Sequence, residues 1–124
     1  MKFLYCRHCK NIVTFLNSSG VTPFCCGEKM SLIEPNKVDA SVEKHTPVVS
    51  VCKKVVTVVV GSILHPATSE HRIDWIMIET NLGRQRKLIP VGDAPKVKFA
   101  LLEDEKVIAA YEYCNLHGLW MTSV

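Results

Sequence analysis

The sequence contains no apolar run long enough to cross a membrane as a helix. Its longest apolar stretch, VVTVVVGSIL at 55–64, is far shorter than the roughly 18 residues that a membrane-spanning helix needs. The opening residues, MKFLYCRHCK, also lack the continuous apolar core and the small-residue cleavage site of a secretory signal peptide. These absences lead us to expect a soluble, cytoplasmic protein that has no membrane partner.

Blocks of like charge and long helical patterns are also missing. The net charge is only +3, and the lysines and arginines are scattered, so no patch suggests nucleic acid as a partner. No long segment places apolar residues at the helical spacing of 3.6, and no internal repeat is visible. With 48% hydrophobic residues the chain can still bury a core, which excludes a disordered protein.

Short β-type segments fill the chain from about residue 38 onward. They are rich in Val, Ile, Phe and Tyr, and turn signals such as NLG, VGDAP and LEDEK separate them. Apolar residues and lysines alternate within KVKFA, as expected for a strand with one buried face. The five segments are 53–64, 71–80, 86–92, 96–104 and 106–114. This pattern predicts an all-β domain of antiparallel strands, either a sandwich or a barrel.

The first thirty residues differ from the rest because they are rich in cysteine and poor in apolar residues. A unit with so little core usually needs a metal or disulfide staple. The stretch LIEPNK at 32–37 is typical of a connector, since its proline and asparagine interrupt regular structure. We therefore expect a metal-stapled N-terminal domain over residues 1–36 and an all-β domain over residues 37–124.

Four cysteines of the N-terminal unit have the spacing of a tetrathiolate metal site. Cys6 and Cys9 form a C-x-x-C pair, and the adjacent Cys25 and Cys26 follow after fifteen intervening residues. A C-x-x-C turn lets two thiolates reach one ion, and a turn near Gly20 would bring the second pair across. Such a site suits zinc or a single iron ion. Because the second pair is adjacent, we expect the angle between its sulfurs at the metal to depart from the tetrahedral ideal.

Metal binding is the first explanation for these thiols, because a reducing cytosol disfavours structural disulfides. Reduced structural thiols and a redox-active C-x-x-C pair are the other interpretations. His8 lies inside the C-x-x-C loop, where we expect it to face solvent without a role. Cys52, in SVCKK, belongs to no such pattern, and we expect a partly buried or free thiol there.

A second group of candidate ligands is spread over the rest of the chain. It comprises His45, His65, His71, His117 and the late cysteine Cys114. Several of them lie at the ends of predicted strands, and strand-end loops of a β-sandwich gather at one edge of the fold. Imidazoles with a soft thiolate suit a redox-active transition metal better than magnesium or calcium. The pair in CNLH also leaves open core packing or a cysteine hydrolase, although no nucleophile elbow is visible.

Three segments around these residues resemble the signature segments of the superoxide reductases. They are EKHTPVV at 43–49, GSILHPATSEHRIDWI at 61–76 and YCNLHGLW at 113–120. The four upstream cysteines resemble the iron site of desulforedoxin. Together, and in this order, these features are similar to the two-iron superoxide reductases of the desulfoferrodoxin family over essentially the whole chain.

The resemblance implies a desulforedoxin-like first domain, an immunoglobulin-like sandwich of seven strands, and two mononuclear iron sites. The first iron would be held by the four upstream cysteines. The second would be ferrous, with four equatorial imidazoles, an axial thiolate and one open position. Its ligands would be His45, His65, His71, His117 and Cys114. Ala67 stands where the family usually has methionine, which we expect to alter packing beside the site and not ligation.

The implied reaction is the one-electron reduction of superoxide to hydrogen peroxide, with electrons from a rubredoxin-like protein. Lys44 would hold its ammonium near the open position and attract the superoxide anion, an effect that salt screens. Glu43 would occupy that position in the ferric resting state. The N-terminal iron would relay or store one electron, and the resemblance together with the thin core of the first domain implies a homodimer.

Two other functions remain compatible with the sequence. A non-catalytic electron-transfer protein would use the same iron centres but would lack an open coordination position. A structural zinc module joined to an immunoglobulin-like binding domain would be colourless, because zinc has a filled d shell.

Overall fold

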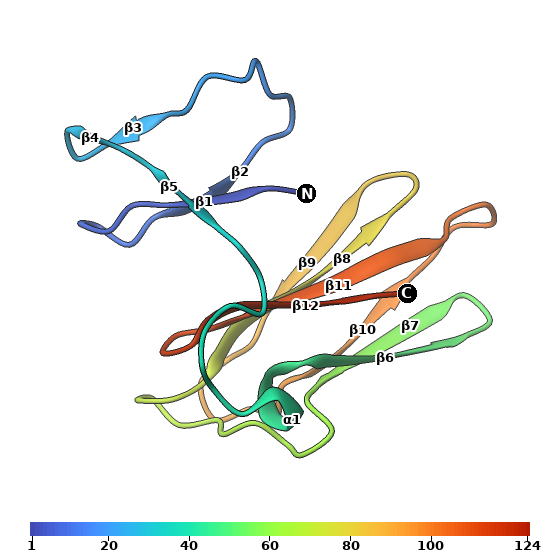
Figure 1. The fold of residues 1–124 in the computed structure, drawn as a ribbon. Helices are drawn as coiled ribbons and strands as arrows, with labels where there is room; N and C mark the ends of the chain where they lie inside the picture. Colours follow the sequence, from blue (N-terminus) through green and yellow to red (C-terminus); the bar gives the residue numbers. More distant parts are fainter. The chain divides into compact units, whose positions relative to one another are not determined.

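The computed structural model describes residues 1–124, which divide into two compact units (Figure 1). The first unit is Met1–Glu34 and the second is Pro35–Val124. The expected first domain, residues 1–36, ends two residues beyond this division. Strands dominate both units, and α1 (Val42–His45) is the only helix. With a single turn, α1 has neither the length nor the apolar character to cross a membrane.

A three-stranded antiparallel sheet and a short hairpin form the first unit. Its strands are β1 (Phe3–Tyr5), β2 (Ile12–Thr14), β3 (Phe24–Cys25), β4 (Glu28–Lys29) and β5 (Ser31–Ile33). The sheet has the order β2-β1-β5, and β3 pairs with β4. The core consists of Leu4, Cys6 and Met30, with Phe15 and Cys25 packed against them. Because two of these five residues are cysteines, the interior of this unit depends on its thiols.

Two antiparallel sheets form a seven-stranded sandwich in the second unit (Figure 1). Its strands are β6 (Pro47–Cys52), β7 (Val55–Val60), β8 (Ile73–Thr80), β9 (Arg84–Leu88), β10 (Lys96–Ala100), β11 (Val107–Cys114) and β12 (Gly118–Ser123). One sheet has the order β10-β7-β6, and the other has the order β12-β11-β8-β9. The all-β architecture with a seven-stranded second unit is therefore confirmed.

Alternating side chains fill the space between the two sheets. In β7, Val56, Val58 and Val60 are fully buried, whereas the residues between them are more exposed. This is the period of two that a strand shows when one face is packed. Phe99 of β10 belongs to the same core, and so does Cys114 at the end of β11. The core therefore reaches the candidate ligand thiol.

Side-chain hydrogen bonds close the two sides of the sandwich. On one side, Lys87 Nζ of β9 donates to the carbonyl oxygen of Lys98 in β10 at 2.6 Å. On the other side, the Thr122 hydroxyl of β12 donates to the carbonyl oxygen of Pro47 in β6 at 2.7 Å. Edge strands with unpaired backbone groups can pair with other chains, so these bonds also protect the edges.

Asn36 attaches the start of the second unit to β12. Its backbone N–H donates to the carbonyl oxygen of Leu119 at 3.0 Å. Its side chain donates to the carbonyl oxygen of Met121 at 3.1 Å and accepts from the N–H of Met121 at 2.9 Å. The φ of Asn36 is 61°, in the left-handed region that asparagine adopts more readily than most residues.

Three connections that carry candidate ligands lie at one end of the sandwich (Figure 1). They are α1, the loop between β7 and β8, and the turn between β11 and β12. A β-bulge occurs at this end, because Tyr113 pairs with Trp75 but Cys114 pairs with Ile73, which leaves Asp74 unpaired. Such bulges often change the direction of a side chain next to a functional site.

Three elements differ from the sequence-based expectations. The predicted segments contain β7, β8, β10 and β11, and segment 86–92 overlaps only the second half of β9. Strands β6 and β12 were not among the five predicted segments. Most of β6 is exposed, so it shows no clear alternation of buried and exposed residues. The third element is the single turn α1, which ends at His45 and was not predicted. One turn of helix is too short to produce a recognisable helical period.

Candidate metal centres

The four cysteines of the first unit bring their sulfur atoms together. The sulfurs of Cys6, Cys9, Cys25 and Cys26 all lie within 4.8 Å of one another. The sulfurs of Cys9 and Cys25 are 3.5 Å apart, and every cysteine of the chain is a free thiol. Cys6 is buried while Cys9 and Cys26 are exposed, so the cluster lies at the surface of its unit.

Tight turns direct these thiols to one point. The turn after Cys6 is closed by the N–H of Lys10, which donates to the Cys6 carbonyl oxygen at 2.9 Å. Strands β3 and β4 are joined by Cys26 and Gly27, whose φ values of 51° and 76° are those of a type I′ hairpin turn. Adjacent side chains of a strand point to opposite faces. The left-handed conformation of Cys26 therefore turns its sulfur toward that of Cys25.

The thiols of this cluster have very different pKa values, because each meets different hydrogen-bond partners. The backbone N–H of Cys9 is the main cause that lowers the pKa of Cys6 to about 6. The neighbouring thiols, Cys9 above all, raise the pKa of Cys26 to about 12. Four thiolates at these distances repel one another unless a cation lies between them. The sulfur cluster therefore fits a bound iron or zinc ion.

His8 is exposed to solvent, as the sequence suggested, but it also contacts Glu28. Its Nε2 lies 2.6 Å from Oε2 of Glu28, and Arg7 Nε donates to the same oxygen at 2.8 Å. His8 and then Arg7 hold the pKa of Glu28 below its usual value. These contacts join the C-x-x-C turn to β4, next to the Cys26-Gly27 turn.

The five candidate ligands of the second unit converge at one end of the sandwich. The ligand atoms of His45, His65, His71 and Cys114 lie within 4.8 Å of one another. His117 joins them from the turn after β11. Its Nδ1 lies 3.0 Å from Nε2 of His45 and 3.7 Å from the sulfur of Cys114.

The four imidazole rings form a square. Its sides, measured between ring centroids, are 4.7 Å for His45–His65, 4.5 Å for His65–His71, 5.0 Å for His71–His117 and 4.8 Å for His45–His117. The diagonal between His45 and His71 is 6.1 Å. Neighbouring rings meet at 75–87°, so they do not stack. The sulfur of Cys114 lies 3.4 Å from Nε2 of His65. Four nitrogens and one sulfur thus face a common centre.

Backbone carbonyls decide which nitrogen two of these histidines present. Nδ1 of His45 lies 2.7 Å from the carbonyl oxygen of Ser41, and Nδ1 of His65 lies 2.7 Å from that of Pro66. A carbonyl oxygen can only accept, so each Nδ1 carries the proton and the lone pair remains on Nε2. The two Nε2 atoms are 3.2 Å apart. Bonds of this kind orient histidines that bind metals.

Burial favours the neutral form of His45, His65 and His71. His45 and His65 are each 2% exposed. Burial lowers the pKa of His45 and His71 and lowers the pKa of His65 to about 4. Nε2 of His71 is also buried and has no hydrogen-bond partner, and burial raises the pKa of the Cys114 thiol. This set of buried nitrogens and one sulfur fits a transition-metal ion such as iron, which would satisfy the lone pairs and stabilise the thiolate.

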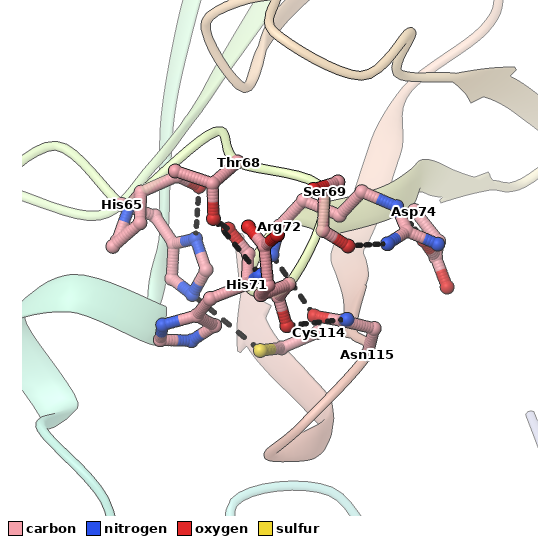
Figure 2. Close-up of polar contacts among 10 residues, drawn as sticks. His65, Thr68, Ser69, His71, Arg72, Asp74, Cys114 and Asn115 are labelled. Atoms are coloured by element: carbon pink, nitrogen blue, oxygen red, sulfur yellow. Dashed lines mark hydrogen bonds and ion pairs between the residues drawn. The ribbon is translucent and has the colours of Figure 1, made fainter.

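Asn115 ties the end of β11 to the loop that carries His71 (Figure 2). Its Oδ1 accepts from the N–H of Arg72 at 2.9 Å, and its N–H donates to the Arg72 carbonyl oxygen at 3.1 Å. Its Nδ2 donates to the carbonyl oxygen of Glu70 at 3.0 Å. Sequence reasoning overlooked Asn115, although an asparagine directly after the ligand Cys114 was the available signal.

Thr68 and Trp120 support two of the ligands and were also overlooked. The hydroxyl oxygen of Thr68 accepts from the N–H of His71 at 3.0 Å, which closes the turn before this ligand (Figure 2). Trp120 stacks on His45 with ring centroids 5.0 Å apart. The indole N–H of Trp120 donates to the carbonyl oxygen of His117 at 3.2 Å. A loop threonine and a strand tryptophan carry no sequence signal for these contacts, which arise from tertiary packing.

Glu43 and Lys44 lie in α1 directly before His45, and both are exposed. The carbonyl oxygen of Glu43 accepts from the N–H of Ile63 at 3.0 Å and from the Ser62 hydroxyl at 3.2 Å. The backbone N–H of Glu43 is the first cause that lowers the pKa of its own carboxyl. A carboxylate and an ammonium therefore stand next in sequence to the histidine square.

Cys52 stays apart from both metal clusters. It is an exposed free thiol at the end of β6. Ala67, the departure from the family pattern, is half-buried between Pro66 and Thr68 in the loop of His65 and His71.

Comparison with known proteins finds relatives that cover nearly the whole chain. Residues 37–123 match the family model described as Desulfoferrodoxin. A desulfoferrodoxin from Nitratidesulfovibrio vulgaris is 40% identical over 115 residues, which are 93% of this chain and 90% of the relative.

Solved structures of superoxide reductases also match this chain. The crystal structure of the superoxide reductase from Treponema pallidum superposes with a TM-score of 0.82 at 40% identity and covers 98% of both chains. A superoxide reductase (1Fe-SOR) from Giardia intestinalis matches with a TM-score of 0.58 at 31% identity. That match covers 66% of this chain and 97% of the Giardia chain.

Proposed function

The chain belongs to the desulfoferrodoxin family, and from this premise we propose that it is an oxidoreductase, a superoxide reductase. In this reaction a superoxide anion takes up one electron and two protons and leaves as hydrogen peroxide. The observation that carries the proposal is the square of four imidazoles that Cys114 completes with a thiol. This donor set suits iron, and ferrous iron when bound supplies the single electron that the reaction consumes.

The five protein donors leave room for a small anion. An octahedral ion takes six ligands, and this end of the sandwich offers four nitrogens and one sulfur. Because the imidazoles are neutral and the thiolate carries one negative charge, a ferrous site has a formal charge of +1. A centre with that charge favours a monoanion such as superoxide. The carbonyls of Ser41 and Pro66 keep His45 and His65 in the tautomer that leaves the lone pair of Nε2 free for an ion.

Two charged residues of α1 complete the proposed site. The exposed ammonium of Lys44, next to the ligand His45, raises the local concentration of superoxide. The carboxyl of Glu43 has a lowered pKa and is therefore ionised at neutral pH. It would take the vacant ligand position after hydrogen peroxide has left.

The tetrathiolate cluster would hold a second iron that relays or stores one electron. Its exposed Cys9 and Cys26 support electron entry at the surface of the first unit. The proposed donor is a rubredoxin-like protein. In this assignment the domain of residues 1–36 handles electrons, and the domain of residues 37–124 binds and reduces superoxide.

Exposed apolar side chains of the first unit support a homodimer. Leu16, Val21 and Phe24 are 94%, 72% and 66% exposed, and the core of this unit is small. Pairing of two copies would remove such side chains from water. The six free thiols support a location in the reducing cytoplasm.

The stoichiometry of the iron-loaded protein tests the proposed activity. With a reducing partner present, each superoxide consumed should yield one hydrogen peroxide, whereas dismutation yields one for every two. Azide or cyanide should shift the visible spectrum of the second centre, since one ligand position is free. A coloured protein that binds neither anion and consumes no superoxide would be an electron carrier, and a colourless protein would hold zinc.

Lys44→Ala should slow the reaction with superoxide by about tenfold at low salt, because steering by a nearby charge has at least that size. The dependence of the rate on ionic strength should also weaken. Stopped-flow or pulse-radiolysis rates measure both. Lys106→Ala is the matched control, since Lys106 is an exposed lysine in the connection before β11. Equal rates for wild type and Lys44→Ala would remove Lys44 from the mechanism.

A further inference from the structure

Three consecutive residues after β7 hold the backbone of α1. The Ser62 hydroxyl and the Ile63 N–H both donate to the carbonyl oxygen of Glu43, at 3.2 Å and 3.0 Å. The third residue, Gly61, lies against the same segment. We call Gly61, Ser62 and Ile63 the Glu43 clasp.

Gly61 lets the two segments approach this closely. A Cβ at this position would collide with the Glu43 carbonyl oxygen and would lie 2.7 Å and 2.9 Å from the carbonyl carbon and Cα of Lys44. Side chains do not tolerate contacts of that length with backbone atoms. Only glycine therefore allows α1 to lie directly against the end of β7.

The Glu43 clasp fixes the position of Glu43 and Lys44 more than that of the ligand His45. The His45 ring is fixed separately, because its Nδ1 donates to the carbonyl oxygen of Ser41 and its face stacks on Trp120. The exposed carboxyl of Glu43 is held by its own backbone N–H, within α1 itself. The exposed ammonium of Lys44 has no such contact, so its place depends on where the backbone of α1 lies. A single helical turn is also unstable by itself, since short helices depend on tertiary contacts.

We infer that Ser62 is a positioning residue, which holds the Glu43–Lys44 segment beside the histidine square through the Glu43 carbonyl oxygen. The inference rests on the proposed function in one respect, namely that Lys44 attracts superoxide. Without the Ser62 hydroxyl, the Ile63 N–H is the only remaining donor to that oxygen. The ammonium of Lys44 then ranges more widely and spends less time where it attracts the anion.

Hydrogen exchange in the iron-loaded full chain tests the clasp without reference to activity. In Ser62→Ala, the backbone amides of residues 41–46 and 61–65 should exchange faster than in wild type, as read by mass spectrometry of peptides. Ser62→Thr retains a hydroxyl and should restore the slow exchange. Thr14→Val removes a hydroxyl bond to the Lys2 carbonyl oxygen, 2.7 Å long, and should leave both peptides unchanged.

Superoxide kinetics test the positioning role. Ser62→Ala should lower the low-salt rate by about threefold, a fraction of the steering effect, and flatten its salt dependence. Iron content and the thiolate-to-iron absorption should stay at wild-type values. In the Lys44→Ala background, Ser62→Ala should cause no further loss, because both substitutions act through one group. Gly61→Ala should reproduce the phenotype of Ser62→Ala, because its methyl group pushes the same backbone away.

Two results would overturn the inference. Unchanged exchange in both Ser62→Ala and Gly61→Ala would show that the clasp does not hold α1. Faster exchange with wild-type rates and wild-type salt dependence would show that the clasp does not position Lys44. If wild type reduces no superoxide, the proposed function fails, and the exchange measurement still decides whether the clasp exists.

Discussion

The Nδ1 atoms of His45 and His65 each meet a backbone carbonyl oxygen, and this contact decides which nitrogen faces the centre of the site. His117 presents Nδ1 instead, 3.0 Å from Nε2 of His45. The two nitrogens of a histidine lie at different distances from its backbone. Whether Nδ1 or Nε2 faces the centre therefore sets how close the main chain must come to the site. At the scale of single residues, the site therefore depends on which nitrogen each histidine presents as well as on the presence of four histidines.

Cys114→Ser should abolish the thiolate-to-iron absorption of the second centre and most of the superoxide reduction. Cys114 supplies the only sulfur among the five donors, and a serine oxygen is a harder ligand. Visible spectra and superoxide rates of the iron-loaded variant measure both effects. Cys52→Ser is the control, because this exposed thiol belongs to neither cluster. Loss of the second iron in Cys52→Ser would show that the thiols are wrongly assigned.

At the scale of elements, two asparagines join neighbouring connections in the same manner at opposite ends of the sandwich. Asn115 makes three hydrogen bonds to residues 70 and 72 at the metal end. Asn81 makes three hydrogen bonds at the other end, two with the backbone of Lys106 and one with the carbonyl oxygen of Asp104. Asn81, which is far from the metal site, is therefore a matched control for Asn115.

Asn115→Ala should weaken iron binding at the second centre by about tenfold to a hundredfold, the usual cost of losing a contact that orients ligands. It should also lower the free energy of unfolding by about 1–3 kcal/mol, because it leaves backbone groups of Arg72 and Glu70 without their partner. Competition with a chelator measures the affinity, and urea unfolding measures the stability.

Asn81→Ala should cost a similar amount of stability and leave iron affinity unchanged, since no ligand lies near residue 81. Wild-type iron affinity in Asn115→Ala would contradict the assignment of Asn115 to the metal site. An affinity that falls equally in both variants would show that general loosening of the sandwich, and not the contact with the His71 loop, controls metal binding.

At the scale of the whole molecule, the histidine square couples stability to pH when no metal is bound. Above pH 6.5, His65 is neutral in both the folded and the unfolded chain, and the stability is fully present. Between 6.5 and about 4, the unfolded chain binds a proton that the folded chain does not. The free energy of unfolding therefore falls as pH falls through this window, by about 1–3 kcal/mol for His65. Lowered pKa values of His45 and His71 act in the same direction.

Urea unfolding of the metal-free protein between pH 8 and pH 4, roughly the window of imidazole titration, checks this slope. His65→Gln should flatten part of it, because glutamine does not titrate. A metal-free protein whose stability is constant from neutral pH down to pH 5 would contradict the burial of neutral imidazoles.

Much of the architecture could be predicted from the sequence because its signals are local. The alternating valines of β7 predict a strand with one buried face, and turn residues separate the segments from one another. The four cysteines could also be assigned to one cluster, because their spacing within one small unit leaves few alternatives.

The finer structure of the sites could not be predicted, because it depends on partners distant in sequence. Trp120 stacks on a histidine 75 residues earlier, and Asn115 bonds to a loop more than 40 residues earlier. The contact between His8 and Glu28 exists only because β3 and β4 fold back as a hairpin. Family resemblance assigned the ligands, but the contacts that orient them required the structure.

The hairpin of β11 and β12 supplies both Cys114, the last residue of β11, and His117 in its turn, and Cys114 pairs directly with Gly118. Two donors on so short a segment form a chelate. An ion that detaches from one donor remains at a high effective concentration beside the other and is recaptured before it diffuses away. Opening of this hairpin would withdraw two of the five donors at once, so strand pairing at its base prolongs the lifetime of the loaded protein.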